Sequence, residues 1–85
     1  MKSFVHIIND PEGLHARSCV VIVHEASKWS STVVVSCNDL EADAKRMAPL
    51  LALKAVRGDS LVVSCEGPDE IEAASALEAL MRMSI

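Results

Sequence analysis

The sequence predicts an α+β fold, in which helices pack on one face of a β-sheet. Four stretches rich in aliphatic and β-branched residues and three helical patterns follow one another as strand, helix, strand, strand, helix, strand, helix, an order typical of this class. The turn at Asn38-Asp39 joins two of the strands so closely that they must pair antiparallel. Because Phe4 and Trp29 are the only aromatic residues, we expect a core of aliphatic side chains.

The first strand and the first helix are predicted to meet at His15. Residues 4–8 are apolar or β-branched, as in a strand, and within them His6 is expected to face solvent. Residues 9–13 carry turn chemistry, with Asp before Pro and a Gly free to take a positive φ. Helical spacing begins at once and indicates one face formed by Ala16, Cys19, Val23 and Ala26.

The middle of the chain predicts a hairpin and a short helix. Residues 32–37 have strong β propensity, and residues 40–43 are expected to return as a short strand after the turn. Residues 47–53 predict a short apolar helix, because Pro49 is tolerated in a first helical turn.

The last third of the chain predicts a strand followed by the closing helix. Residues 60–65 alternate in the manner of a strand, and residues 66–69 form a turn in which Asp69 is a good N-cap. A core-facing stripe is predicted in the closing helix from Ala73, Ala74, Leu77, Leu80 and Met81.

Composition limits the classes of function. The 85 residues suffice for one small core, so residues 1–85 are expected to form a single domain. A net charge of −4 argues against a nucleic-acid partner. No apolar run approaches the roughly 18 residues that span a bilayer, and no signal-peptide pattern is present. With three cysteines and no C-x-x-C pair, the chain fits a reducing compartment, and we expect a cytoplasmic protein without membrane insertion.

His15 is the leading candidate for chemistry. The first N–H groups of a helix have no internal partners and lie at the positive end of the helix dipole, so they bind anions. Arg17 adds a guanidinium that binds phosphate oxygens in a fork. A neutral imidazole is nucleophilic near pH 7, so this junction suits a transferable phosphoryl group. The alternative is an ordinary surface histidine beside a helix start.

A metal site or a cysteine nucleophile at His15 and Cys19 is a weaker alternative. The two residues are four apart and share a helix face. Neither a further set of ligands nor a base stands at suitable spacing. We therefore expect no metal and no cofactor, and no second acid–base residue is placed near His15.

The segment Gly-Leu-His-Ala-Arg-Ser at residues 13–18 resembles the active-site motif G-[IL]-H-[AT]-R-P of the HPr family, the histidine-containing phosphocarriers of the bacterial phosphotransferase system. The likeness extends over the whole chain. It implies a two-layer open-faced sandwich, with a four-stranded antiparallel sheet in the order 1-4-2-3 and three helices on one face.

The resemblance also implies a function. Enzyme I would phosphorylate His15 at Nδ1, with phosphoenolpyruvate as the ultimate donor, and the chain would pass the group to an enzyme IIA. It would be a carrier and not an enzyme, and we expect a monomer. Arg17 and the N–H groups of Ala16 to Ser18 would hold the phosphoryl group.

Two positions depart from the family pattern. Ser18 stands where the family usually has proline; serine is tolerated there and adds an N–H and a hydroxyl as possible phosphate donors. Arg46 stands where many Gram-positive members carry a serine phosphorylated by a kinase, so regulation through that position is expected to be absent.

The first two helices carry more apolar residues than their core stripes need, which marks a docking site. Family members bind enzyme I and IIA proteins on these helices. We expect the interface to contain Val20, Val21, His24, Met47, Ala48 and Leu51, whereas Leu50 and Leu53 are expected in the core. Basic residues that would steer an acidic partner, if they lie beside His15, are Lys45, Arg46, Lys54 and Arg57. For Lys54 and Arg57 a solvated helix face is an equal alternative.

Two other functions stay open at this stage. One is a carrier of the same chemistry in a regulatory branch, either of the nitrogen-related type or serving a dihydroxyacetone kinase. The other is a regulatory binding module that is not phosphorylated. Retention of both His15 and Arg17 argues against that module.

Overall fold

Four strands form one antiparallel sheet in the order β1-β4-β2-β3. The computed structural model describes residues 1–85. The strands are β1 (Lys2–Ile7), β2 (Thr32–Cys37), β3 (Leu40–Asp43) and β4 (Ser60–Glu66). The predicted order and the hairpin at Asn38-Asp39 are confirmed; both turn residues have positive φ, 52° and 66°, as a tight hairpin turn requires.

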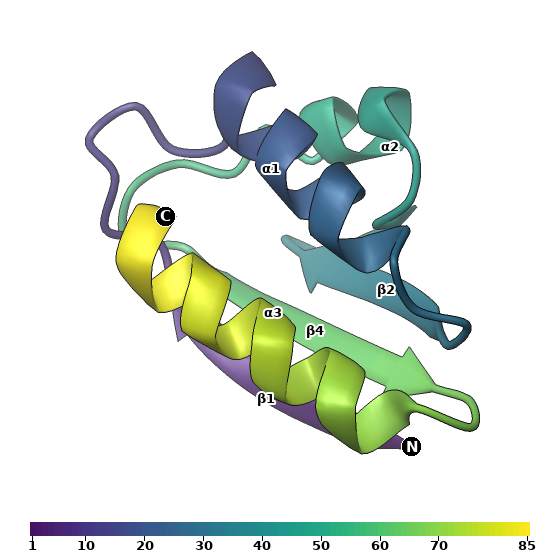
Figure 1. Ribbon diagram of the computed structural model, residues 1–85. Helices are drawn as coiled ribbons and strands as arrows, with labels where there is room; N and C mark the ends of the chain where they lie inside the picture. Colours follow the sequence, from purple (N-terminus) through teal and green to yellow (C-terminus); the bar gives the residue numbers. More distant parts are fainter.

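Three helices cover one face of the sheet, as predicted, and leave the other open (Figure 1). They are α1 (Ala16–Ala26), α2 (Met47–Ala52) and α3 (Glu70–Ser84). In Figure 1, α3 runs along β1 and β4, whereas α1 and α2 lie over the half of the sheet that contains β2. None of the helices is long and apolar enough to cross a lipid bilayer.

The core lies between the two layers and consists mainly of aliphatic side chains, as expected, together with the three cysteines. Of the predicted stripe of α3, Ala73, Ala74, Leu77 and Met81 are buried, whereas Leu80 is only half-buried. Leu50 and Leu53 of the second helical segment are buried too. Helix α1 differs from its prediction at one end. Ala16 is exposed and Ser18 is buried, because the face that meets the sheet passes through Ser18, Cys19, Ile22 and Ala26.

The prediction that His6 faces solvent is wrong. Its side chain lies on the helix side of β1, where Nε2 is buried and has no hydrogen-bond partner. Burial lowers the pKa of His6, because removal from water disfavours the charged ring. Val5 and Ile7 occupy the open face instead, 59% and 54% exposed. Alternation correctly separated the two sets but does not say which set is covered.

Asp69 stands at the N-cap position of α3 but does not cap it. Its carboxylate accepts hydrogen bonds from the N–H groups of Ser30 and Ser31, both at 2.9 Å, and from the Ser31 hydroxyl. The hydroxyl contact is the main cause of a lowered pKa for Asp69. Asp69 therefore binds the distant Ser30 and Ser31 instead of the N–H groups of its own helix, and it joins the start of α3 to the start of β2.

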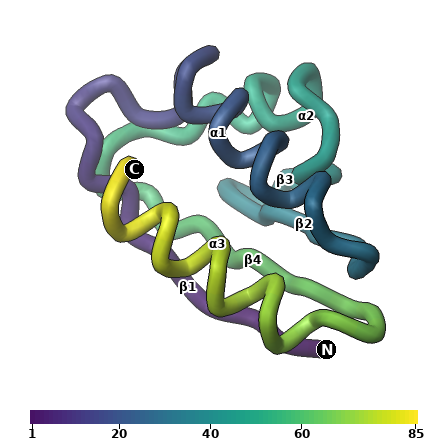
Figure 2. Tube along the Cα trace, in the orientation of Figure 1, coloured from purple at the N-terminus to yellow at the C-terminus, as the bar shows by residue number.

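The loop before α1 and the segment after α2 lie side by side, as the two traces show (Figures 1 and 2). Leu14 N–H donates to the Ala55 carbonyl at 3.0 Å, and Gly58 N–H donates to the Ile8 carbonyl at 2.9 Å. Gly13 has a φ of +68°, and a Cβ there would overlap the Ala55 carbonyl oxygen and lie 2.8 Å from Val56 Cα. This approach requires glycine.

Gly13→Ala is expected to destabilise the protein more than Gly58→Ala. Both glycines have positive φ, but nothing lies within 4 Å of a Cβ at Gly58. Gly58→Ala should therefore lower the free energy of unfolding only by the cost of placing alanine in a left-handed backbone conformation, about 1–2 kcal/mol. Gly13→Ala carries the same cost and adds a steric overlap with the backbone of the neighbouring segment. Urea unfolding of the two variants measures the difference. Equal losses would show that the contact with Ala55 and Val56 is not tight.

Asp69→Asn is expected to destabilise the protein at neutral pH and to lose that effect in acid. Because the folded pKa of Asp69 is depressed, its contribution is present above the unfolded value of about 3.9 and disappears as the pH falls through the folded pKa. Urea unfolding across this range measures it. Asp39→Asn, at an exposed turn carboxylate without hydrogen bonds, is the control. A pH-independent difference between wild type and Asp69→Asn would contradict the assignment.

Candidate functional site

His15 is the N-cap residue of α1, with extended backbone angles (φ −129°, ψ 179°). The predicted position is confirmed. The first hydrogen bond of the helix runs from Cys19 N–H to the His15 carbonyl, at 2.9 Å. The N–H groups of Ala16, Arg17 and Ser18 therefore precede the first helical donor and have no backbone carbonyl as a partner. They supply the positive end of α1 next to the imidazole.

Ser18 closes the first turn of α1. Its hydroxyl accepts the His15 N–H at 3.0 Å and donates to the His15 carbonyl at 3.0 Å, and the residue is buried. The hydroxyl expected as an additional phosphate donor is thus already engaged with the backbone of His15. Ser18 therefore offers its backbone N–H and not its hydroxyl, and in the capping box of α1 that N–H faces the His15 side chain.

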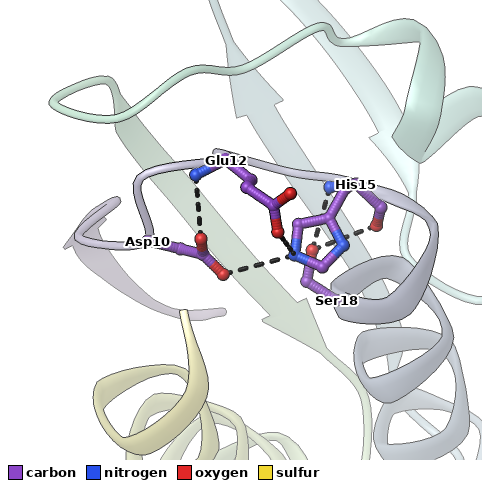
Figure 3. A network of polar contacts seen from close by, with 4 residues as sticks. All are labelled: Asp10, Glu12, His15 and Ser18. Atoms are coloured by element: carbon purple, nitrogen blue, oxygen red, sulfur yellow. Dashed lines mark hydrogen bonds and ion pairs between the residues drawn. The ribbon is translucent and has the colours of Figure 1, made fainter.

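Two carboxylates, which the sequence did not place there, stand beside the His15 ring (Figure 3). Nε2 is 3.2 Å from Asp10 Oδ2 and 3.9 Å from Glu12 Oε2. The His15 side chain is 28% exposed and that of Asp10 is 23% exposed, whereas Glu12 is largely in solvent. The other ring nitrogen, Nδ1, lies on the side of the ring away from both carboxylates (Figure 3).

Asp10 is fixed by the turn that carries it. Its Oδ1 accepts the Glu12 N–H at 2.9 Å, its carbonyl accepts the Gly13 N–H at 2.9 Å, and its own N–H donates to Ile85 oxygen at 2.8 Å. The bond from Glu12 and the bond with His15 lower the pKa of Asp10, so it is a carboxylate at neutral pH. The only sequence signal is an acid five residues before a histidine, and that spacing does not by itself place the carboxylate at the ring.

The predicted surface residues lie on the two adjoining helices, with unequal exposure. Arg17 and Ala16 are exposed at the start of α1. Val20 and Leu51 are 54% and 39% exposed. His24 and Ala48 are also exposed, but Val21 and Met47 are half-buried. Sequence reasoning missed Val56, which is 59% exposed beside Gly13; a lone valine in a connecting segment gives no periodic signal.

The basic residues of the middle segment divide into two groups. Lys45 Nζ donates to the Trp29 carbonyl at 2.8 Å, so it is tied to the connection between α1 and β2. Lys54 and Arg57 are exposed on either side of Ala55 and Val56, the pair that contacts Gly13. Lys54 and Arg57 therefore flank the segment that packs against the loop before His15, whereas Lys45 does not.

Cys19 takes no part in the site. It is fully buried, and burial raises the pKa of its thiol, which makes it a poor nucleophile. Ligand atoms from Asp10, Glu12 and His15 lie within 4.8 Å of one another. This is the one group of residues with the spacing of a cation site, but the hydrogen bond and ion pairs of His15 already account for it.

The chain is similar to known proteins over almost its whole length. Residues 2–83 match the family model described as "PTS HPr component phosphorylation site". The chain is 34% identical over 82 residues to the phosphocarrier protein HPr of Mycoplasma genitalium, covering 95% of this chain and 93% of that protein. It superposes on a Mycoplasma histidine-containing phosphocarrier protein with a TM-score of 0.94 at 30% identity, covering 98% and 94% of the two chains. For HPr of Thermoanaerobacter tengcongensis the TM-score is 0.91 at 35% identity, with 96% and 92% covered. The chain belongs to the HPr family of phosphocarrier proteins of the phosphotransferase system.

Proposed function

We propose that this chain carries a phosphoryl group on Nδ1 of His15, accepts it from phosphorylated enzyme I and passes it to enzyme IIA proteins. One observation carries the proposal. The imidazole stands at the start of α1 with its Nε2 against two carboxylates, which leaves Nδ1 on the side away from them. A nucleophilic nitrogen and an anion-binding helix end are thereby combined in one residue.

Transfer needs a nucleophile and a holder for three phosphoryl oxygens. The Nδ1 lone pair forms the new bond to phosphorus, while the bond from phosphorus to the donor breaks and its electron pair leaves with the donor. The N–H groups of Ala16, Arg17 and Ser18 lack helical acceptors and would bind the oxygens, with the exposed Arg17 guanidinium as a second holder. These contacts are charge-assisted hydrogen bonds, firm enough to hold the group and weak enough to release it.

Partner proteins would dock around His15 on α1 and α2. The exposed members of the expected interface are Val20, His24, Ala48 and Leu51, and Val21 and Met47 form its half-buried floor. To these we add Val56, which is exposed beside Gly13. An apolar patch next to the transferable group suits a partner that must present its own acceptor at short range.

Regulation at Arg46 is expected to be absent. Arg46 is the N-cap residue of α2, the position that a regulatory serine would take, and a guanidinium is not a substrate for a serine kinase. The three cysteines are buried and unpaired, which supports a reducing compartment and a cytoplasmic carrier.

His15→Ala is expected to abolish phosphoryl acceptance and leave the fold intact, because the side chain lies at a surface junction. Incubation of the purified protein with enzyme I of an HPr-containing system and labelled phosphoenolpyruvate gives the measurement. Label on the wild type should be lost in acid and kept in base, as for a phosphorus–nitrogen bond. Stable label on His15→Ala would contradict the assignment, and an unlabelled wild type would favour the regulatory binding module.

Arg17→Ala is expected to slow phosphoryl acceptance by roughly tenfold or more, the scale of one hydrogen bond to a charged group, while some acceptance survives on the backbone N–H groups. Rapid-quench measurement of labelling by enzyme I determines the rate. Lys28→Ala removes the same charge just beyond the C-terminal end of α1, where Lys28 pairs only with Glu25 at 3.2 Å. Equal rates for Arg17→Ala and Lys28→Ala would show that the guanidinium does not hold the phosphoryl group.

A further inference from the structure

We infer that Asp10 is a positioning residue for His15, which keeps the proton on Nε2 and so makes Nδ1 the nucleophile and the phosphorylated ring a ready donor. The inference rests on the proposed function and deepens it, because it names the residue that selects between two chemically similar nitrogens. Glu12 assists as the second, more distant carboxylate.

The geometry allows Asp10 only one role toward the ring. Its two oxygens are divided between two donors, with Oδ1 on the Glu12 N–H at 2.9 Å and Oδ2 on His15 Nε2 at 3.2 Å. An ionised carboxylate only accepts hydrogen bonds, so Nε2 must carry the proton for the contact to be favourable. In a neutral imidazole the proton on one nitrogen leaves the lone pair on the other. Nδ1 is therefore left unprotonated.

The backbone of Asp10 is held in place from two directions. Ile85 oxygen accepts the N–H groups of Asn9 and Asp10, both at 2.8 Å, and Leu14 N–H is bonded to the Ala55 carbonyl at 3.0 Å. The turn between them is thus anchored to α3 on one side and to the segment after α2 on the other. A carboxylate on such a turn can orient a neighbouring ring without being reordered itself.

The same proton matters in both directions of transfer. When Nδ1 of the neutral ring attacks phosphorus, the ring acquires a positive charge that the Asp10 carboxylate faces. In the onward step a bond forms between phosphorus and the acceptor, the Nδ1–phosphorus bond breaks, and its electron pair returns to Nδ1. With the proton retained on Nε2 the leaving group is a neutral imidazole; without it, the leaving group would be an imidazolate, which leaves poorly.

Few other charges face this contact. Arg17 of α1 acts on Asp10 from the side of the helix start. From α3, Arg82 lines a shallow hollow of about 220 Å³ together with Asp10, and its guanidinium is paired with Glu78 at 3.3 Å. Glu12 is the only further carboxylate within 4 Å of the ring. Asp10 and Glu12 therefore decide whether Nε2 carries the ring proton.

Asp10→Asn provides a sharp test, because it should invert the tautomer. The Asn oxygen would keep the Glu12 N–H, so its NH₂ group would face Nε2 and require a lone pair there, which moves the ring proton to Nδ1. Asp10→Ala removes the bias without reversing it. The ¹⁵N chemical shifts of the neutral ring at pH about 8.5, above the ordinary histidine range, distinguish the two tautomers without any partner protein.

Acceptance from phosphoramidate, a small phosphoryl donor, supplies the second readout. We expect Asp10→Asn to reduce the rate at Nδ1 by roughly 10- to 100-fold, the scale of one hydrogen bond to a charged group. In the phosphorylated protein, acid-catalysed loss of the group should require a lower pH than in wild type, because the carboxylate that holds the Nε2 proton is gone. Asp39→Asn, the same change in the exposed β2–β3 turn, should match wild type in both readouts.

The outcomes separate the two proposals. An inverted tautomer in Asp10→Asn with a shifted pH profile supports the role of Asp10. An unchanged tautomer in Asp10→Asn overturns it, even if His15 is phosphorylated normally. An inverted tautomer together with a wild-type protein that enzyme I does not phosphorylate would leave Asp10 as the positioning residue and refute the carrier function instead.

Discussion

The position of His15 depends on a backbone contact between two loops. The turn before α1 and the segment after α2 approach so closely at Gly13 and Ala55 that no side chain fits between them. This contact fixes where the chain enters α1, and therefore where the N-cap falls. Without it, the imidazole would not stand at the helix end, and the Asp10 carboxylate would not reach Nε2.

Charge is divided across the imidazole in a way that follows from this placement. Carboxylates face one nitrogen, and the positive end of α1 with Arg17 lies at the other side of the residue. In the proposed arrangement, a ring held in such a field has one protonated and one nucleophilic nitrogen and receives the phosphoryl group on the nucleophilic side. The protein is acidic overall, with a net charge of −4, so the anion site is local and depends on the helix start and a single arginine. Ser18 contributes by closing the first turn, which explains how the family's usual proline can be replaced there without losing the helix start.

Much of the fold was predictable because its signals are local. The alternation in β4, the hairpin at Asn38-Asp39 and the stripe of α3 each follow from neighbouring residues, and each is present in the structure. The family resemblance supplied the strand order, which local patterns do not contain. Errors arose where a distant partner decides the outcome. Asp69 has the chemistry of an N-cap, but Ser30 and Ser31 take its carboxylate from nearly forty positions away. His6 belongs to a strand with apolar residues on both faces, and only α3 determines which face is covered.

The site was predictable only where its signals are local. His15, Arg17 and the amides of the first turn follow from a motif at a helix start, which the sequence displays. Asp10 was overlooked because its role depends on the path of a five-residue turn, and turn types set the direction of side chains in ways that residue identity alone does not determine. Val56 was missed because it belongs to no helix or strand.

The central claim is that one nitrogen of one histidine carries the phosphoryl group. The most direct measurement is ³¹P and ¹⁵N NMR of the ¹⁵N-histidine-labelled protein after phosphorylation by enzyme I and phosphoenolpyruvate, which shows the nitrogen bonded to phosphorus. The account predicts a single phosphorus–nitrogen bond, at Nδ1 of His15, with the proton on Nε2. A phosphoryl group on Nε2, on His6 or His24, or on no histidine at all would contradict it.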